Sequence, residues 1–256
     1  MKNLSTAATI LLAATLTLSG CKTTHTTTTI EKVEVPAAPA PVANAGSITG
    51  TIHFTGKPPA RVDIDMSMDP ACEMLAPKND SEQYIVANGK LANVYVYVKA
   101  GAPPSKAPAN AAPVVLDQKG CRYTPHVIAL QQGGSVEFRN SDPTMHNIHT
   151  TPANPGEPSI DVSQGPMGAP QTRQFSQPET MLPVRCNNHP WMNAFINVSA
   201  TPFFAVSAAD GSFTISGLPP GNYTLAAVHE KLGEQDIQVT VPPSGTAKAD
   251  FTYAIK

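Results

Sequence analysis

The sequence predicts an all-β protein, a class indicated by its residue patterning and by its composition. Short runs rich in Val, Ile and Thr recur along the chain, as at 91–98 and 135–139. Turn-forming segments separate them, and Pro alone accounts for 26 of the 256 residues. β-Branched residues favour strands, and Pro and Gly mark the turns between strands. The length allows one or two domains with a sizeable buried core.

The chain carries little charge, and the charge is nearly balanced. Charged residues make up 14% of the sequence, and the formal net charge is −2. Because a nucleic-acid-binding protein needs a basic face, binding to nucleic acid is not expected. A nearly neutral chain also creates no strong field that would steer a charged partner.

The N-terminus has the pattern of an export signal. Lys2 precedes an apolar stretch, residues 10–18, that is too short to span a membrane as a helix. The next residues, Leu18-Ser-Gly-Cys21, resemble the lipobox of bacterial lipoproteins. The resemblance implies that residues 1–20 are a signal peptide and that Cys21 becomes the acylated first residue. The alternative is an ordinary secretory signal with an unmodified cysteine.

Residues 21–45 are expected to form an extended tether. They are rich in Thr, Ala and Pro, a composition that cannot build a core. Two acyl chains anchor a protein stably to a bilayer. Because Lys22, and not Asp, follows Cys21, we expect an anchor in the outer membrane that faces the periplasm. His25 is expected to be a solvated residue of the tether.

Strands are predicted at both ends of the remaining chain. Residues 46–56 alternate apolar and polar side chains and end in a Gly-Lys-Pro-Pro turn. Asp210-Gly211 and the Pro-Pro-Gly-Asn run at 219–222 mark two tight turns farther along. Further strands are predicted at 91–98, 236–241 and 247–253.

The C-terminal stretch resembles the transthyretin-like, or carboxypeptidase-regulatory-like, β-sandwich. The resemblance is carried by Asp210-Gly211, Phe213, Leu218-Pro-Pro-Gly221 and Tyr223-Thr-Leu225. It covers too little of the chain for a whole sandwich, so the strands at 46–56 and 91–98 are expected to complete it. We therefore expect a small sandwich built from residues 46–110 and 201–256, with a second domain inserted at 111–200. Two sequential domains are the alternative.

The middle segment also reads as a series of strands. A Gly133-Gly134 turn precedes one of them, and a long excursion rich in Pro and Gly occupies residues 151–170. The predicted strands are 113–116, 126–130, 135–139, 145–149, 172–175, 182–186 and 195–198.

Four residues of this segment form a candidate copper site. They are His146, Cys186, His189 and Met192. A thiolate, two imidazoles and a weakly bound thioether are the donors of a blue copper electron-transfer site, and they suit both oxidation states of the metal. The bound metal keeps Cys186 ionised. Pro190 removes a backbone donor and stiffens the turn beside His189. The predicted cofactor is therefore one copper ion.

The cysteine count is consistent with that site. If Cys21 carries lipid, three cysteines remain in an oxidising compartment, and three cannot all pair. Cys186 has the metal-ligand neighbours, so we predict that it is free and that Cys72 and Cys121 form a disulfide. That bond would close a loop of about 50 residues and contribute roughly 4 kcal/mol. The alternative is two free buried cysteines.

Residues 111–200 resemble the cupredoxins, the blue copper Greek-key β-sandwiches. The matching features are the Gly-Gly turn before Val136-Glu-Phe, the Asn140-x-Asp142-x3-His146-Asn147 run, and Cys186-x2-His189-x2-Met192 before a last strand. The short ligand loop most resembles that of amicyanin, with plastocyanin and pseudoazurin as longer-looped relatives. The resemblance assigns the metal ligands to His146, Cys186, His189 and Met192.

The resemblance also implies roles for residues beside the ligands. Asn147 is expected to hold the two ligand segments together, with its backbone amide bonded to the cysteine sulfur. The loop histidine is expected to reach the surface through an apolar patch where electrons leave. Trp191, Pro190 and the pair Pro166-Met167 are the candidates for that patch, with Trp191 as a docking residue for a partner.

The remaining histidines are not expected to bind the metal. His149 lies three residues from His146, and residues three apart on a strand point to opposite faces. His126 is expected to be structural or exposed, His53 has no assigned role, and His229 is expected to be solvated. Met145 adjoins a ligand but faces away from it, so Met192 is the better axial candidate.

These observations predict a membrane-tethered periplasmic protein that carries single electrons between a redox donor and a redox acceptor protein. It is expected not to be an enzyme, and no catalytic residue is predicted. One alternative is a lipoprotein that stores or delivers copper with the same ligands. Another is an adhesion or carbohydrate-binding lipoprotein whose sandwich does the work. A copper oxidase or nitrite reductase is disfavoured because the sequence offers no second histidine cluster.

Overall fold

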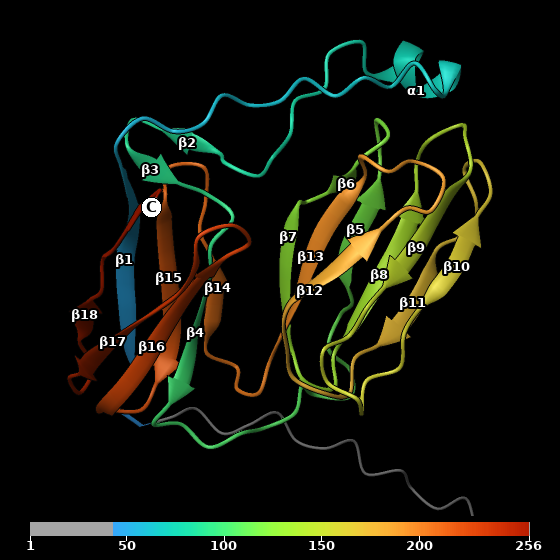
Figure 1. Ribbon diagram of the computed structural model, residues 1–256. Helices are drawn as coiled ribbons and strands as arrows, with labels where there is room; N and C mark the ends of the chain where they lie inside the picture. The colour runs from blue at the N-terminus through green and yellow to red at the C-terminus, as the bar shows by residue number, and fades with distance from the viewer. Residues whose placement is uncertain (1–42, 256) are drawn as a thin grey trace, which may run out of the picture. The chain divides into compact units, whose positions relative to one another are not determined.

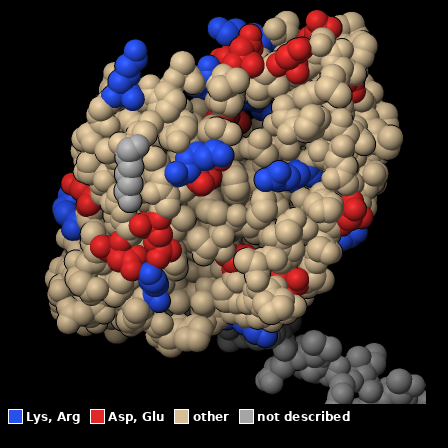
Figure 2. Space-filling model, in the orientation of Figure 1, with Lys and Arg blue, Asp and Glu red and all other residues tan. Residues whose placement is uncertain are grey.

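The computed structural model describes residues 43–255, and this part of the chain is all-β apart from one short helix (Figure 1). The expected signal peptide (1–20), the lipidation residue Cys21 and nearly all of the tether (21–45) lie outside the described residues. Within 43–255, no helix is long and apolar enough to cross a membrane. On the face drawn in Figure 2, acidic and basic side chains are scattered among uncharged ones and form no continuous basic surface.

Two sheets enclose the first hydrophobic core. One contains β1 (Gly46–Thr55), β2 (Val86–Ala87), β3 (Lys90–Leu91), β15 (Ser212–Leu218), β18 (Thr246–Lys248) and β19 (Phe251–Ala254). The other has the order β14 (Phe204–Val206), β4 (Tyr95–Ala100), β16 (Gly221–His229), β17 (Gly233–Val241). Alternate residues of β1 are buried, as the sequence pattern predicts. The core is formed by residues such as Ile48, Ile52, Leu225 and Tyr253.

Two further sheets enclose a second core. One has the order β10 (Asp161–Gln164), β9 (His146–Thr150), β12 (Glu179–Arg185), β13 (Asn193–Ser199), β7 (Val127–Gln131). The other has the order β11 (Gln171–Gln174), β8 (Ser135–Asn140), β5 (Val114–Gln118), β6 (Tyr123–Thr124). The core includes Phe138, Ile148 and Ile196 together with Cys186 and Met192. Two of the predicted ligands are therefore core residues.

The two pairs of sheets are interleaved in sequence. In the described chain, β1 and β4 pair with strands from β14 to β19, and β2 and β3 join the sheet of β1, whereas β5 to β13 pair among themselves. The chain thus leaves the first pair of sheets after β4, builds the second pair, and returns at β14. The boundary residues expected for the domains stay a prediction.

Residues 57–85, hereafter the 57–85 segment, connect β1 to β2 but also contact the second core. The segment carries α1 (Pro70–Leu75), whose Asp69 caps the helix by accepting hydrogen bonds from the backbone amides of Ala71 and Cys72. Met66 and Cys72 are buried in the second core. Sequence patterning assigned this stretch to the first sandwich because it lies between two of that sandwich's strands.

Gly50 is a position where β1 tolerates no side chain. β1 pairs with β18 up to Thr49 and with β19 from Ile52, so the chain between β18 and β19 crosses over Gly50. A Cβ at residue 50 would lie 1.7 Å from the carbonyl oxygen of Ala249 and 2.7 Å from the Phe213 ring.

We expect Gly50→Ala to lower the free energy of unfolding by about 3 kcal/mol, because backbone of the crossing must move. Gly221→Ala is the matched control: its Cβ would meet only the Tyr223 side chain, at 3.6 Å or more. Denaturant unfolding of both variants checks the prediction. Equal stabilities of the two variants would show that the backbone between β18 and β19 can shift at little cost in free energy.

Candidate metal centre

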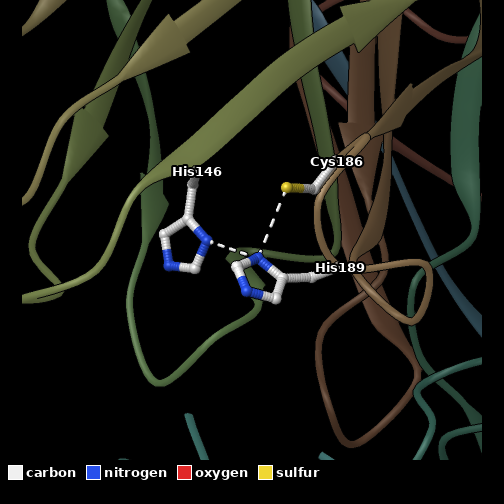
Figure 3. A group of neighbouring side chains, drawn as sticks. All are labelled: His146, Cys186 and His189. Carbon is white, nitrogen blue, oxygen red and sulfur yellow. Dashed lines mark hydrogen bonds between the residues drawn. The ribbon is translucent and has the colours of Figure 1, made fainter. Parts of the chain in front are cut away.

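Three of the predicted ligands converge on one point (Figure 3). His146 is the first residue of β9, Cys186 directly follows β12, and His189 lies in the loop between β12 and β13. The Nδ1 atoms of the two histidines are 3.0 Å apart, and the Cys186 Sγ atom is 3.5 Å from His189 Nδ1. All three side chains are at most 4% exposed. Segments about 40 residues apart in sequence thus bring two ring nitrogens and one sulfur together in the interior.

The ligand loop is short and internally bonded. β12 and β13 stay paired up to Arg185 and Asn193, so the seven residues 186–192 between them turn the chain. The Cys186 amide donates to the Met192 carbonyl, and the Met192 amide donates to the His189 carbonyl. Met192 is 1% exposed and packs in the same core as Cys186. Its role as the axial ligand stays a prediction.

A carboxylate holds the outer nitrogen of each histidine. His146 Nε2 is 2.9 Å from Asp142 Oδ2, and His189 Nε2 is 2.9 Å from Asp69 Oδ2. A carboxylate only accepts hydrogen bonds, so each Nε2 carries a proton, and each Nδ1 is the ring nitrogen left to bind a metal. Two Nδ1 atoms and a sulfur then face one another in a buried space.

That arrangement fits a metal ion. Two ring nitrogens 3.0 Å apart need a proton or a metal cation between them. A carboxylate on the far ring nitrogen is the usual support of a metal-binding histidine. Two imidazole nitrogens and one thiolate are the equatorial donors that copper prefers in electron-transfer sites. The residues present therefore fit the copper ion expected from the sequence.

The surroundings of Cys186 favour its ionised form. Burial alone raises the pKa of a thiol, but hydrogen bonds from His146 and from the backbone amides of Asn147 and Asn188 lower the pKa of Cys186 to about 7. Burial lowers the pKa of His146, yet its hydrogen bonds to Asp142 and Cys186 raise that pKa to about 9. Cys186 is therefore poised to bind a cation as a thiolate.

Asn147 connects the two ligand segments. Its backbone amide donates to the Cys186 sulfur at 3.3 Å, and its side-chain oxygen accepts from the Asn187 amide at 3.4 Å. Its side-chain nitrogen donates to Asp161 at 2.9 Å. The contacts with Cys186 and Asn187 are of the kind that the resemblance to cupredoxins implies for Asn147.

The predicted disulfide is present: Cys72 and Cys121 are bonded, and Cys186 is the free cysteine of the described residues. The Cys72–Cys121 disulfide lies beside both histidine–carboxylate pairs. Donor atoms of Cys72, Asp69 and His189 lie within 4.8 Å of one another, as do those of Cys121, Asp142 and His146. The amides of Gly120 and Cys121 also donate to Asp142, at 2.7 and 2.8 Å.

The expected exit for electrons at His189 is not exposed. His189 is only 4% exposed because Asp69 covers its outer nitrogen, so the expectation that this histidine reaches the surface was wrong. Trp191 is half-buried, with its ring 5.1 Å from the His189 ring, and its Nε1 donates to the Cys121 carbonyl. Trp191 and the exposed Pro190 line a surface hollow of about 270 Å³. Met167, also a candidate for the patch, is 67% exposed.

The other histidines have structural contacts. The His149 ring lies 3.4 Å from Asp161 and is outside the metal-binding groups found in the described residues. His126 is buried and its Nε2 lies 2.6 Å from Glu230. The expectation that His229 is solvated was wrong: it is 2% exposed, and burial lowers its pKa to about 4.

Sequence reasoning missed both carboxylates. Asp142 lies within the quoted Asn140-to-Asn147 run, four residues before His146, and this spacing was a usable signal. Asp69 comes from the 57–85 segment, distant in sequence from the ligands. The predicted bond between Cys72 and Cys121 was the available signal, since it placed residues near Cys72 beside the copper segment.

Comparisons with known proteins find partial likeness. The family model of the carboxypeptidase regulatory-like domain matches residues 185–254, which include the ligand loop, β13 and the strands from β14 to β19. No curated protein matches the chain. A copper-containing nitrite reductase from Thermus scotoductus SA-01 is similar over 40% of this chain, at 23% identity and a TM-score of 0.32. The chain spans 25% of that enzyme. A mutant of amicyanin in its Cu(I) form is similar over 41% of this chain and 98% of its own, at 19% identity and a TM-score of 0.31.

Proposed function

We propose that this protein is a single-copper electron carrier of the blue copper type. One observation carries the proposal: the buried Nδ1 atoms of His146 and His189 and the Cys186 sulfur face a common point. A copper ion bound there supplies reversible one-electron transfer between its two oxidation states. The thioether of Met192, at the end of the same loop, is the proposed axial donor.

The protein residues make the transfer fast by moving little. Asp142 and Asp69 fix the two rings, the Asn147 amide holds the sulfur, and the ligand loop is closed by its own backbone hydrogen bonds. Preorganised donors reduce the rearrangement that a change of oxidation state requires. Burial also argues against the alternative of copper storage or delivery, which needs an exchangeable and more exposed metal.

We propose that the carrier works on the periplasmic side of a bacterial membrane, with its lipid anchor in the outer membrane, as Lys22 after Cys21 suggests. The lipid on Cys21 and the tether at 21–45 would keep the copper domain near its partners, a redox donor and a redox acceptor protein. The hollow beside Trp191 and Pro190 is the proposed docking face. The Trp191 ring connects that face to the metal centre, because it packs against the His189 ring.

A redox titration tests the function. The full chain with Cys21→Ala, which prevents lipidation, is loaded with copper and titrated while its absorption is recorded. We expect one copper per chain, an intense thiolate-to-copper band, and reversible loss of that band on uptake of one electron. Copper binding with no such band, or a band that does not return on reoxidation, would contradict the proposal.

A further inference from the structure

Asp69 contacts the candidate metal centre, although it belongs to the 57–85 segment and not to the strands and loop that carry the ligands. Its Oδ2 atom accepts hydrogen bonds from His189 Nε2 at 2.9 Å and from the Thr144 hydroxyl at 3.1 Å. Its Oδ1 atom accepts from the backbone amides of Ala71 and Cys72 at 2.8 and 3.4 Å. Both oxygens are therefore engaged, and the carboxylate has one fixed orientation.

The 57–85 segment is attached to the sheets that carry the ligands at two places that follow Asp69 in the chain. Cys72, three residues later, is bonded to Cys121 beside β6. Farther along, Arg122 donates to the Asp80 carbonyl at 3.1 Å and lies 3.5 Å from Glu82. These links keep Asp69 against His189.

Asp69 also limits the access of solvent to His189. A hollow of about 280 Å³ opens to the surface there and is lined by Met68, Asp69, Thr144, Met145, Asn188 and His189. Met68 and Met145 are 76% and 49% exposed, whereas His189 is 4% exposed. Asp69 and His189 both line this hollow, and Asp69 Oδ2 covers the outer nitrogen of the ligand histidine.

We propose that Asp69 is a positioning residue for the ligand His189, and that the 57–85 segment serves as a cover that retains copper in the site. The inference rests on the proposed function. Asp69 fixes the His189 ring with Nδ1 directed at the metal and adds a negative charge close to it. That charge favours the more positive oxidation state, so it lowers the reduction potential.

Asp69→Asn is the clean test, with Asp65→Asn as its control. Asparagine caps a helix as well as aspartate does, so the variant keeps α1 while it removes the charge and weakens the bond to His189. Asp65 is an exposed acid of the same segment that accepts from the Ser67 amide and has no contact with a ligand. Both variants lose one charge from the same segment.

The measurements are the reduction potential, the copper hyperfine splitting in electron paramagnetic resonance, and the copper affinity in competition with a chelator. For Asp69→Asn we expect a higher potential, a changed splitting and an affinity about 10- to 100-fold weaker. For Asp65→Asn we expect values close to those of the wild type. Equal potentials and affinities in the two variants would overturn the inference.

The outcomes separate this inference from the proposed function. If the wild type binds copper without a thiolate band, the carrier proposal fails. The difference in copper affinity between the two variants still tests whether Asp69 helps to retain copper in the site. If the wild type has the band and Asp69→Asn matches Asp65→Asn, the carrier proposal stands and the role of Asp69 fails. Unfolding curves of the metal-free variants show whether either one is misfolded.

Discussion

Replacing Cys186 by alanine is expected to abolish the thiolate-to-copper band completely. Cys72 and Cys121 are bonded to each other, so Cys186 is the free thiol among the described residues. Its sulfur is buried, and its lowered pKa of about 7 makes it the anionic donor of the set. Even residues that support a ligand are worth about 10- to 100-fold in metal affinity, so loss of this ligand should cost more than about 100-fold.

Thermal unfolding with and without copper gives a second readout of the same substitution. Copper that binds only the folded state stabilises the wild type by about 4 kcal/mol when its concentration is about 1,000 times the dissociation constant. Cys186→Ala should lose most of that gain. The metal-free variant should unfold close to the metal-free wild type, because the substitution removes one small buried atom. A band that survives in Cys186→Ala would place the copper on other residues.

The strands and the ligand spacing were readable from sequence because they depend on local patterns. Alternation in 46–56 corresponds to β1, and the separation of Cys186, His189 and Met192 fits a tight loop between paired strands. The all-β class follows from many such segments. The strand β10 was missed because Asp161–Gln164 is short and lies within a stretch rich in Pro and Gly.

The surroundings of the ligands were less predictable because they come from distant segments. Asp69 is 120 residues from His189 in sequence, and the pairing depends on how the 57–85 segment packs. His229 looked like a polar residue at a strand end, yet the Tyr84 ring stacks against it at 5.7 Å and helps to bury it. Burial of a single polar residue is set by tertiary packing, for which the local pattern carries no signal.

The double substitution Cys72→Ala/Cys121→Ala is expected to lower the free energy of unfolding by about 4 kcal/mol, because the bond closes a loop between residues 49 apart. Alanine is the better replacement, since both sulfurs are fully buried and a serine hydroxyl there would lack a partner. Denaturant unfolding of the metal-free protein measures the loss. Wild type unfolded in the presence of a thiol reductant is the matched control and should show a similar loss.

The same double substitution should be more costly in the copper-bound protein than in the metal-free protein. The disulfide lies beside both histidine–carboxylate pairs, and the Cys121 amide also donates to Asp142. Loosening that support should let both rings move, so copper affinity should fall along with stability. If the stability loss is the same with and without copper, the bond acts only on the unfolded chain, and the two carboxylates hold the histidines without it.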